Sequence, residues 1–327
     1  MCQYGDGRLM KNLDKLLSWL QTSEYDGVIL GRRDNFKWIT EENANAVVTN
    51  AEVGVAHLLI EKDGSVTVAA DSSDCPRMEA EQNALGAKGM LIPWYESFEA
   101  HLKDYIGDRT FASDTGIVGT DNVQSDLINV RMQLSEKERK RYRKIGQECA
   151  GIVEGVAMNA RPGQTEQEIA DKIRTGCIAN GISMTRMVYF VPVPEEIKGR
   201  MQKTQKIFAA MQNLMKDGMS YQTYFRKIQE LYAKEGCPEE WKMHHQGGPT
   251  GYGCREFVVT PVIGGRIRNN QAYAWNPTIV GTKCEETTFL TDNGVEIFTR
   301  TKVWPCSMIE TKYGSCSVAD ILYIKNE

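Results

Sequence analysis

The chain lacks the features that would place it in a membrane, in an oxidising compartment or on nucleic acid. It has no apolar run of about 18 residues, and its first residues lack a signal-peptide core. Its net charge of -4 comes without a basic cluster, so we expect no nucleic-acid partner and no membrane partner. Together these absences predict a cytoplasmic protein.

Cysteine and histidine are used sparingly. The 9 cysteines show no Cys-x-x-Cys spacing, which favours reduced thiols over a disulfide framework or a zinc site. Only 4 histidines are present, and two of them, His244 and His245, are adjacent. Because imidazole is a common catalytic and metal-binding group, this pair marks the region where chemistry is expected.

The length of 327 residues and a hydrophobic content of 41% suit about two ordinary domains of mixed α/β class. In the first, residues 1–134, the expected elements are helices over 11–20, 75–84 and 95–105, strands over 27–30 and 90–92, and a hairpin of 54–60 with 65–70. In the second, residues 135–327, they are a long helix after Ser135, a helix over 166–179, helices over 195–215 and 221–235, and a strand-rich C-terminal part. Ser135 with Glu138, and Thr165 with Glu168, have capping-box spacing.

The stretch 243–252 carries the chemistry-bearing motif. His245 is followed closely by Gly247 and Gly248, and small residues of this kind let backbone approach a ligand. A phosphate cradle is disfavoured, because the stretch does not lead from a strand into a helix with Lys-Ser or Lys-Thr. Downstream, Asn276 precedes a proline and Glu285 begins a Glu-Glu-Thr sequence.

In their order along the chain, these segments resemble the pita-bread family of Xaa-Pro dipeptidases, aminopeptidase P, methionine aminopeptidase and creatinase. The segments 13–20, 26–30 and 35–40 resemble its N-terminal domain, and 161–166 resembles its Arg-Pro-Gly-x-Thr-Glu helix pair. The resemblance covers nearly the whole chain. It implies a creatinase-like N-terminal domain over 1–134, a pita-bread catalytic-type α+β domain over 135–327, and a homodimer.

Metallopeptidases of this family hold two divalent cations with two Asp, one His and two Glu. On this chain the resemblance matches His245 to the ligand His and Glu285 to the last Glu, whereas Asn276 and Ser183 stand at the positions of a Glu and an Asp. Two cations about 3.5 to 4 Å apart need anionic oxygen ligands to offset dehydration and mutual repulsion. The resemblance therefore implies a degenerate metal site, with no cofactor expected.

The second domain is also short for this family. Residues 135–327 are about 50 fewer than the roughly 240 that the resemblance leads us to expect, still an ordinary domain size. The deficit falls before Ser183, where the family has the strand with its first metal Asp.

Several neighbours of the pair His245 and Glu285 are candidate substrate contacts. Arg186 is expected either to hold a ligand carboxylate bidentately or to pair with Glu285. Glu285 and Glu286 alternate on a strand, so at most one of them enters the site. The remaining candidate substrate-binding residues are His244, Gly247, Gly248, Tyr252 and Arg255, the last of which has a surface ion pair with Glu256 as its simplest alternative.

Three functions remain open. The first is a metal-independent C–N hydrolase resembling creatinase, in which His245 and Glu285 form the acid/base pair and a small peptide or a small amidino or guanidino compound is the substrate. The second is a non-catalytic binder of a peptide or small molecule. The third is a working Xaa-Pro metallodipeptidase with manganese, zinc or cobalt, against which Ser183 and Asn276 argue.

Overall fold

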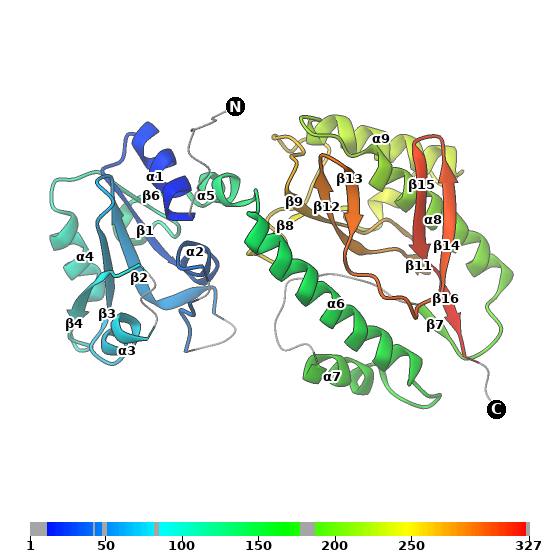
Figure 1. Cartoon of the computed structure of the whole chain (residues 1–327), viewed down its shortest axis with the longest axis horizontal. Helices are drawn as coiled ribbons and strands as arrows, with labels where there is room; N and C mark the ends of the chain where they lie inside the picture. Colours follow the sequence, from blue (N-terminus) through cyan, green and yellow to red (C-terminus); the bar gives the residue numbers. More distant parts are fainter. Residues whose placement is uncertain (1–11, 42, 48–50, 82–84, 177–186, 325–327) are drawn as a thin grey trace. The chain divides into compact units, whose positions relative to one another are not determined.

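The chain divides into two compact units. The computed structural model describes residues 12–41, 43–47, 51–81, 85–176 and 187–324 (Figure 1). The units are Met1–Arg131 and Met132–Glu327, whereas the sequence placed the domain boundary between residues 134 and 135.

The first unit is built on a six-stranded mixed sheet in the order β4-β3-β2-β1-β5-β6. Its strands are β1 Gly27–Arg32, β2 Val53–Glu61, β3 Val66–Asp71, β4 Lys88–Ile92, β5 Phe111–Ser113 and β6 Asp121–Asn122. Its helices are α1 Asn12–Thr22, α2 Arg33–Ile39, α3 Cys75–Ala80, α4 Phe98–Ile106, the 3-10 turn η1 Ile117–Gly119, and α5 Gln124–Arg131. The sheet therefore combines the antiparallel neighbours β1, β2 and β3 with parallel additions at both edges.

Local turn chemistry explains the hairpin of β2 and β3. The Asp63 carboxylate accepts a hydrogen bond from the backbone N–H of Ser65 at 2.8 Å, and Gly64 has a φ of 90°, which glycine adopts without strain. Ile29, Leu59 and Ala69 are fully buried in the core of the unit. The hairpin expected from the sequence is confirmed.

The segment 35–40 forms most of α2, a helix that the sequence pattern did not predict. Asn35 is fully buried, and its side-chain amide donates to the Asp114 carboxylate at 2.9 Å. Arg131 is 1% exposed and pairs with Asp34 at 2.9 Å. A buried polar network of this kind is stable only when its members are paired, so this segment serves the fold of the first unit.

The second unit opens with two helices whose starts were expected from capping boxes. The elements are α6 Glu136–Met158, α7 Glu166–Gly176, α8 Glu195–Leu214, α9 Tyr221–Lys234 and the 3-10 turn η2 Glu240–Lys242. Before α6, Ser135 Oγ accepts from Glu138 N at 3.2 Å and Glu138 Oε2 from Ser135 N at 2.6 Å. Before α7, Thr165 and Glu168 exchange the same two bonds at 3.2 and 2.7 Å. Both predicted capping boxes are confirmed.

The strands of the second unit form a four-stranded antiparallel sheet and three separate pairs. The strands are β7 Met187–Tyr189, β8 Gly247–Thr250, β9 Gln271–Trp275, β10 Thr278–Ile279, β11 Thr282–Lys283, β12 Glu286–Thr291, β13 Gly294–Ile297, β14 Cys306–Thr311, β15 Gly314–Ala319 and β16 Ile321–Tyr323. The sheet has the order β13-β12-β9-β8, and the pairs are β10-β11, β14-β15 and β16-β7. Helix α8 packs on the β14-β15 hairpin, and α6 and α7 lie side by side (Figure 1).

Aromatic side chains fill the core beside the sheet. Tyr273 stacks on Trp275 with ring centroids 5.7 Å apart, and Tyr224 of α9 meets Trp275 at 4.8 Å. All three are fully buried, and such rings contribute both large apolar area and specific ring geometry. Strand β9 is thereby fixed in the centre of the unit.

Only residues 177–186 stand between α7 and β7, which is where the sequence predicts the deficit of about 50 residues. The candidate residues Ser183 and Arg186 fall in this stretch and lie outside the described residues. Over the described ranges, no helix is both long and apolar enough to cross a membrane.

Candidate functional site

Strand order brings His245, Asn276 and Glu285 to one edge of the sheet. Trp275 of β9 is the register partner of Gly247 in β8 and of Glu286 in β12. Since these strands are antiparallel, the start of β8, the end of β9 and the start of β12 lie at the same edge. His245 stands two residues before β8, Asn276 directly after β9 and Glu285 directly before β12. Three positions far apart in the sequence are thus gathered at one place.

The glycine pair is required by the packing of β8, and the expected approach of a ligand to these glycines stays a prediction. Gly247 has a φ of 102°, and a Cβ there would lie 2.1 Å from the carbonyl oxygen of Ala274. At Gly248, a Cβ would lie 2.4 Å from the carbonyl oxygen of Phe257. Both close contacts are with backbone, which cannot move aside as a flexible side chain can. The two glycines let β8 fit between β9 and the segment that follows Phe257.

Buried hydrogen bonds fix the loops at this edge. Gln246 is fully buried; its side-chain oxygen accepts from the Tyr232 hydroxyl at 2.8 Å, and its nitrogen donates to the His244 carbonyl at 2.6 Å. The Tyr232 hydroxyl also accepts from the backbone N–H of Thr278 at 2.9 Å. Beyond the strand, Asn276 N donates to Gln246 O at 3.1 Å. The loop before β8 is therefore tied directly to the loop after β9.

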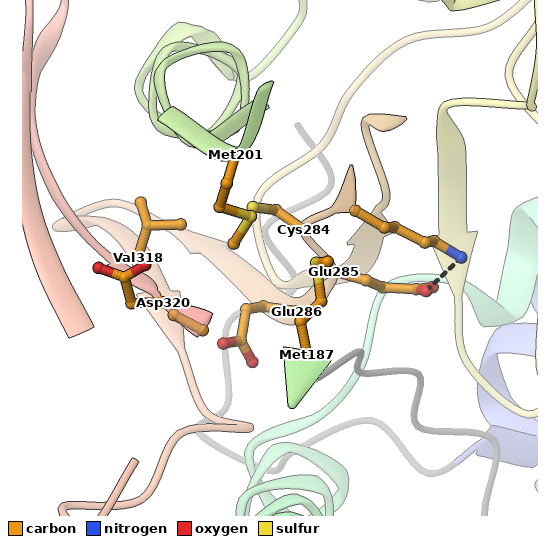
Figure 2. Close-up of a pocket in the computed structure, with 9 residues that line it drawn as sticks. Met187, Met201, Cys284, Glu285, Glu286, Val318 and Asp320 are labelled. Atoms are coloured by element: carbon orange, nitrogen blue, oxygen red, sulfur yellow. Dashed lines mark ion pairs between the residues drawn. The ribbon is translucent and has the colours of Figure 1, made fainter. Parts of the chain in front are cut away.

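Glu285 is held between two cationic side chains. Its carboxylate lies 2.9 Å from Lys283 Nζ, shown as a dashed line in Figure 2, and 3.6 Å from the Arg255 guanidinium. The Glu285 side chain is 7% exposed. Burial at this level requires compensation of the negative charge, and the two cations provide it.

Arg255 is itself anchored to backbone. Its Nη1 donates to the carbonyls of Gly248 at 2.9 Å and Ala274 at 2.7 Å. The alternative of a surface ion pair with Glu256 is wrong, because Arg255 pairs with Glu285 and the buried Glu256 accepts from Gly253 N at 3.1 Å. Arg255 therefore lies at the edge with the candidate residues, as the sequence suggested.

The sequence assigned no role to Lys283, although one signal was available. Lys283 and Glu285 are two positions apart around the start of β12, and alternation along an extended chain places such residues on one face. A lysine two residues before a glutamate in an extended segment therefore indicates a same-face ion pair.

His245 is exposed and its imidazole lies beside that of His244, with ring centroids 4.3 Å apart. Partial loss of solvent lowers the pKa of His245, and the positive charges of His244, Arg255 and Lys283 lower it further against the opposing effect of Glu285. The ring is therefore neutral at neutral pH and able to accept a proton.

Glu286 points away from Glu285, as Figure 2 shows and as alternation predicts. It is 1% exposed, and its carboxylate accepts from Thr299 Oγ1 at 2.6 Å and from Arg300 at 3.4 Å. The small cavity in Figure 2 has a volume of 10 Å³, room for about one water molecule. It is lined by Met187, Met201, Lys283, Cys284, Glu285, Glu286, Val318, Ala319 and Asp320. A cavity of this size cannot hold a peptide.

Tyr252, a candidate substrate contact, braces the start of α6. Its hydroxyl donates to Glu138 Oε1 at 2.5 Å, and burial and the Glu138 carboxylate both raise the pKa of the phenol. The ring packs against the cluster that contains Phe289 and Phe298. The contacts of Tyr252 thus connect the loop after β8 to the helix cap.

Among the described residues, those at the edge offer few ligands for two divalent cations. Glu285 already faces two cationic groups, and Asn276 contributes only a neutral amide whose oxygen is buried without a hydrogen-bond partner. Within the described parts of the chain, no group of three or more His, Cys, Asp or Glu could hold a metal ion. A dinuclear centre needs several anionic oxygen ligands, and the described residues of the edge supply one carboxylate, which is already paired.

Solved structures give an independent comparison. The chain superposes on a dipeptidase from Pyrococcus horikoshii OT3 with a TM-score of 0.74 at 16% identity, covering 89% of this chain and 98% of that chain. It superposes on the Xaa-Pro dipeptidase from Bacillus anthracis with a TM-score of 0.72 at 14% identity, covering 96% of this chain and 99% of that chain. For aminopeptidase P from E. coli the TM-score is 0.66 at 9% identity, with 90% of this chain and 96% of that chain covered. No family model and no curated protein sequence matches the chain.

The chain thus has the pita-bread fold, built from two units of mixed α/β type, as the sequence predicted. Within that class, the structures it resembles are those of prolidases, Xaa-Pro dipeptidases and aminopeptidase P. The resemblance stated from the sequence motifs is confirmed at the level of the fold.

Proposed function

We propose that this chain is a metal-independent recognition protein on the Xaa-Pro peptidase fold, which binds a small peptide-like ligand without hydrolysing it. The observation that carries the proposal is the pairing of Glu285 with Lys283 at 2.9 Å and with Arg255 at 3.6 Å. The carboxylate at the position of the family's last Glu ligand is thus already neutralised by the protein itself.

The same pairing argues against the two hydrolytic alternatives. A metallopeptidase needs ions that activate water, and the two cations beside Glu285 repel them. A creatinase-like reaction needs a carboxylate that orients His245, but Glu285 is engaged by Lys283 and Arg255. The neutral His245 remains available as a polar contact for a ligand.

Charge at the edge favours one ligand chemistry over another. Two cationic side chains face one carboxylate, so a ligand with a free carboxylate is attracted and an amidino or guanidino group is repelled. The solved neighbours are dipeptidases and Xaa-Pro peptidases by name. A small peptide with a free C-terminus is therefore the ligand class that we favour.

The test combines elemental analysis, calorimetric binding and turnover. After dialysis we expect less than one equivalent of manganese, zinc or cobalt per chain. Xaa-Pro dipeptides should bind without cleavage, with guanidino and ureido acids as the comparison set. Two equivalents of metal with chelator-sensitive cleavage would establish the metallodipeptidase instead.

A His245→Ala variant separates binding from metal-independent catalysis. If cleavage occurs without metal, loss of the general base should reduce the rate on the order of 100 to 10,000-fold and show a creatinase-like enzyme. His101→Ala, at a half-buried histidine paired with Glu96 in the first unit, is the matched control. Ligand binding without turnover in the parent, weakened in His245→Ala and unchanged in His101→Ala, supports the recognition protein.

A further inference from the structure

The two oxygens of Glu285 face different cations, and this inference rests on the metal-independent function proposed above. Oε2 lies 2.9 Å from Lys283 Nζ, and Oε1 lies 3.6 Å from Arg255 Nη2. A carboxylate that bridges two metal ions likewise gives one oxygen to each ion. The ammonium and the guanidinium therefore each face one oxygen of the carboxylate, as two ions bridged by it would.

We propose that Lys283 and Arg255 are built-in replacements for the two metal ions, with Lys283 as the counter-ion that keeps Glu285 buried. Glu285 is 7% exposed, so its negative charge needs a permanent partner. The side chain of Lys283 is 28% exposed, which leaves its ammonium partly hydrated while it pairs with the carboxylate. The protein carries its own cations and needs no ion from solution.

Arg255 makes the replacement difficult to reverse. Guanidinium stays protonated in proteins, and that of Arg255 is fixed by the Gly248 carbonyl at 2.9 Å and the Ala274 carbonyl at 2.7 Å. A divalent ion approaching Glu285 would meet this fixed charge as well as Lys283. Both positive groups therefore exclude a metal ion from the edge.

Removal of the Lys283 ammonium tests the proposal. In Lys283→Ala, the melting temperature should fall by about 5 °C, because a buried carboxylate loses one of its counter-ions. Millimolar propylammonium, which fits the space left by the side chain, should restore part of the loss in this variant and leave the parent unchanged. Lys283→Arg keeps the charge and should melt close to the parent.

Two controls make the result specific. Lys198→Ala removes a lysine from an exposed pair, Lys198 with Glu195 at 2.5 Å, and should change the melting temperature by no more than about 1 °C. In Lys283→Ala combined with Glu285→Gln, the carboxylate at position 285 is also removed, so propylammonium should have no effect.

The proposal is overturned if Lys283→Ala melts like Lys198→Ala, or if propylammonium stabilises the variant that also carries Glu285→Gln. It is also overturned if Lys283→Arg is as unstable as Lys283→Ala, because the charge would then not be the cause. The proposed function has a separate test. Two equivalents of metal bound to the parent protein would refute the proposed function, whatever the melting temperatures of the variants.

Discussion

Four glycines of the second unit allow backbone strain and steric contact to be measured separately. Gly247 combines a φ of 102° with a Cβ position 2.1 Å from a carbonyl oxygen. Gly248 has only the close contact, at 2.4 Å, and Gly163 has only the positive φ, of 89°. Gly264 has neither feature, so its replacement reports the cost of the added methyl group alone.

The expected losses in unfolding free energy follow from these geometries. Gly163→Ala should cost about 1 to 2 kcal/mol, the range for a non-glycine residue with positive φ. Gly248→Ala should cost about 1 to 3 kcal/mol, because the backbone must shift to admit the methyl group. Gly247→Ala meets both penalties and should lose about 2 to 5 kcal/mol. Gly264→Ala should stay within about 0.5 kcal/mol of the parent.

Urea unfolding followed by circular dichroism measures all four variants under one set of conditions. If Gly247→Ala were as stable as Gly264→Ala, our account of β8 as a strand confined between backbone neighbours would be wrong. A small stability loss with a large loss of ligand binding would instead return the glycine pair to its expected role as a ligand approach.

Three further outcomes are expected. Burial lowers the folded-state pKa of His57 from 6.5 to about 4, so the contribution of the neutral imidazole to stability is present above pH 6.5 and is lost as the pH falls. Urea unfolding should show the parent losing about 2 kcal/mol of unfolding free energy between pH 7 and 5, a loss that His57→Leu does not show. Tyr252→Phe removes the hydroxyl that donates to buried Glu138 and should cost about 1 to 3 kcal/mol, whereas an unchanged urea midpoint would contradict a bracing role. Asn276→Glu alone should not confer metal binding, because Lys283 and Arg255 remain, and elemental analysis finding two equivalents per chain would count against this.

Sequence patterns predicted those parts of the fold that depend on local chemistry. The capping boxes of α6 and α7, the hairpin of β2 and β3, and helices α8 and α9 follow from capping, turn residues and hydrophobic periodicity. Helix α2 was missed because it is short and depends on buried long-range contacts such as that of Asn35 with Asp114.

At the site, the sequence identified the candidate residues but not the side chains with which they form ion pairs. His245, Asn276 and Glu285 meet at one edge because of strand order, which the family resemblance implied and local pattern does not contain. The reach of Arg255 to Glu285 depends on the course of the chain after β8, which no spacing rule describes. The need for Gly247 came from tertiary packing against Ala274 and could not be read from the motif.

The hydrogen bonds that join Tyr232, Gln246 and Thr278 separate the shape of the edge from its chemistry. They hold the loops before β8 and after β9 with buried protein groups, so hydrogen bonds within the protein fix the shape of this edge. In such a scaffold each candidate ligand-binding residue at the edge can be substituted singly while the strands stay in register, and each singly substituted protein stays folded. A frame held in this way can keep its shape while the residues exposed at this edge change.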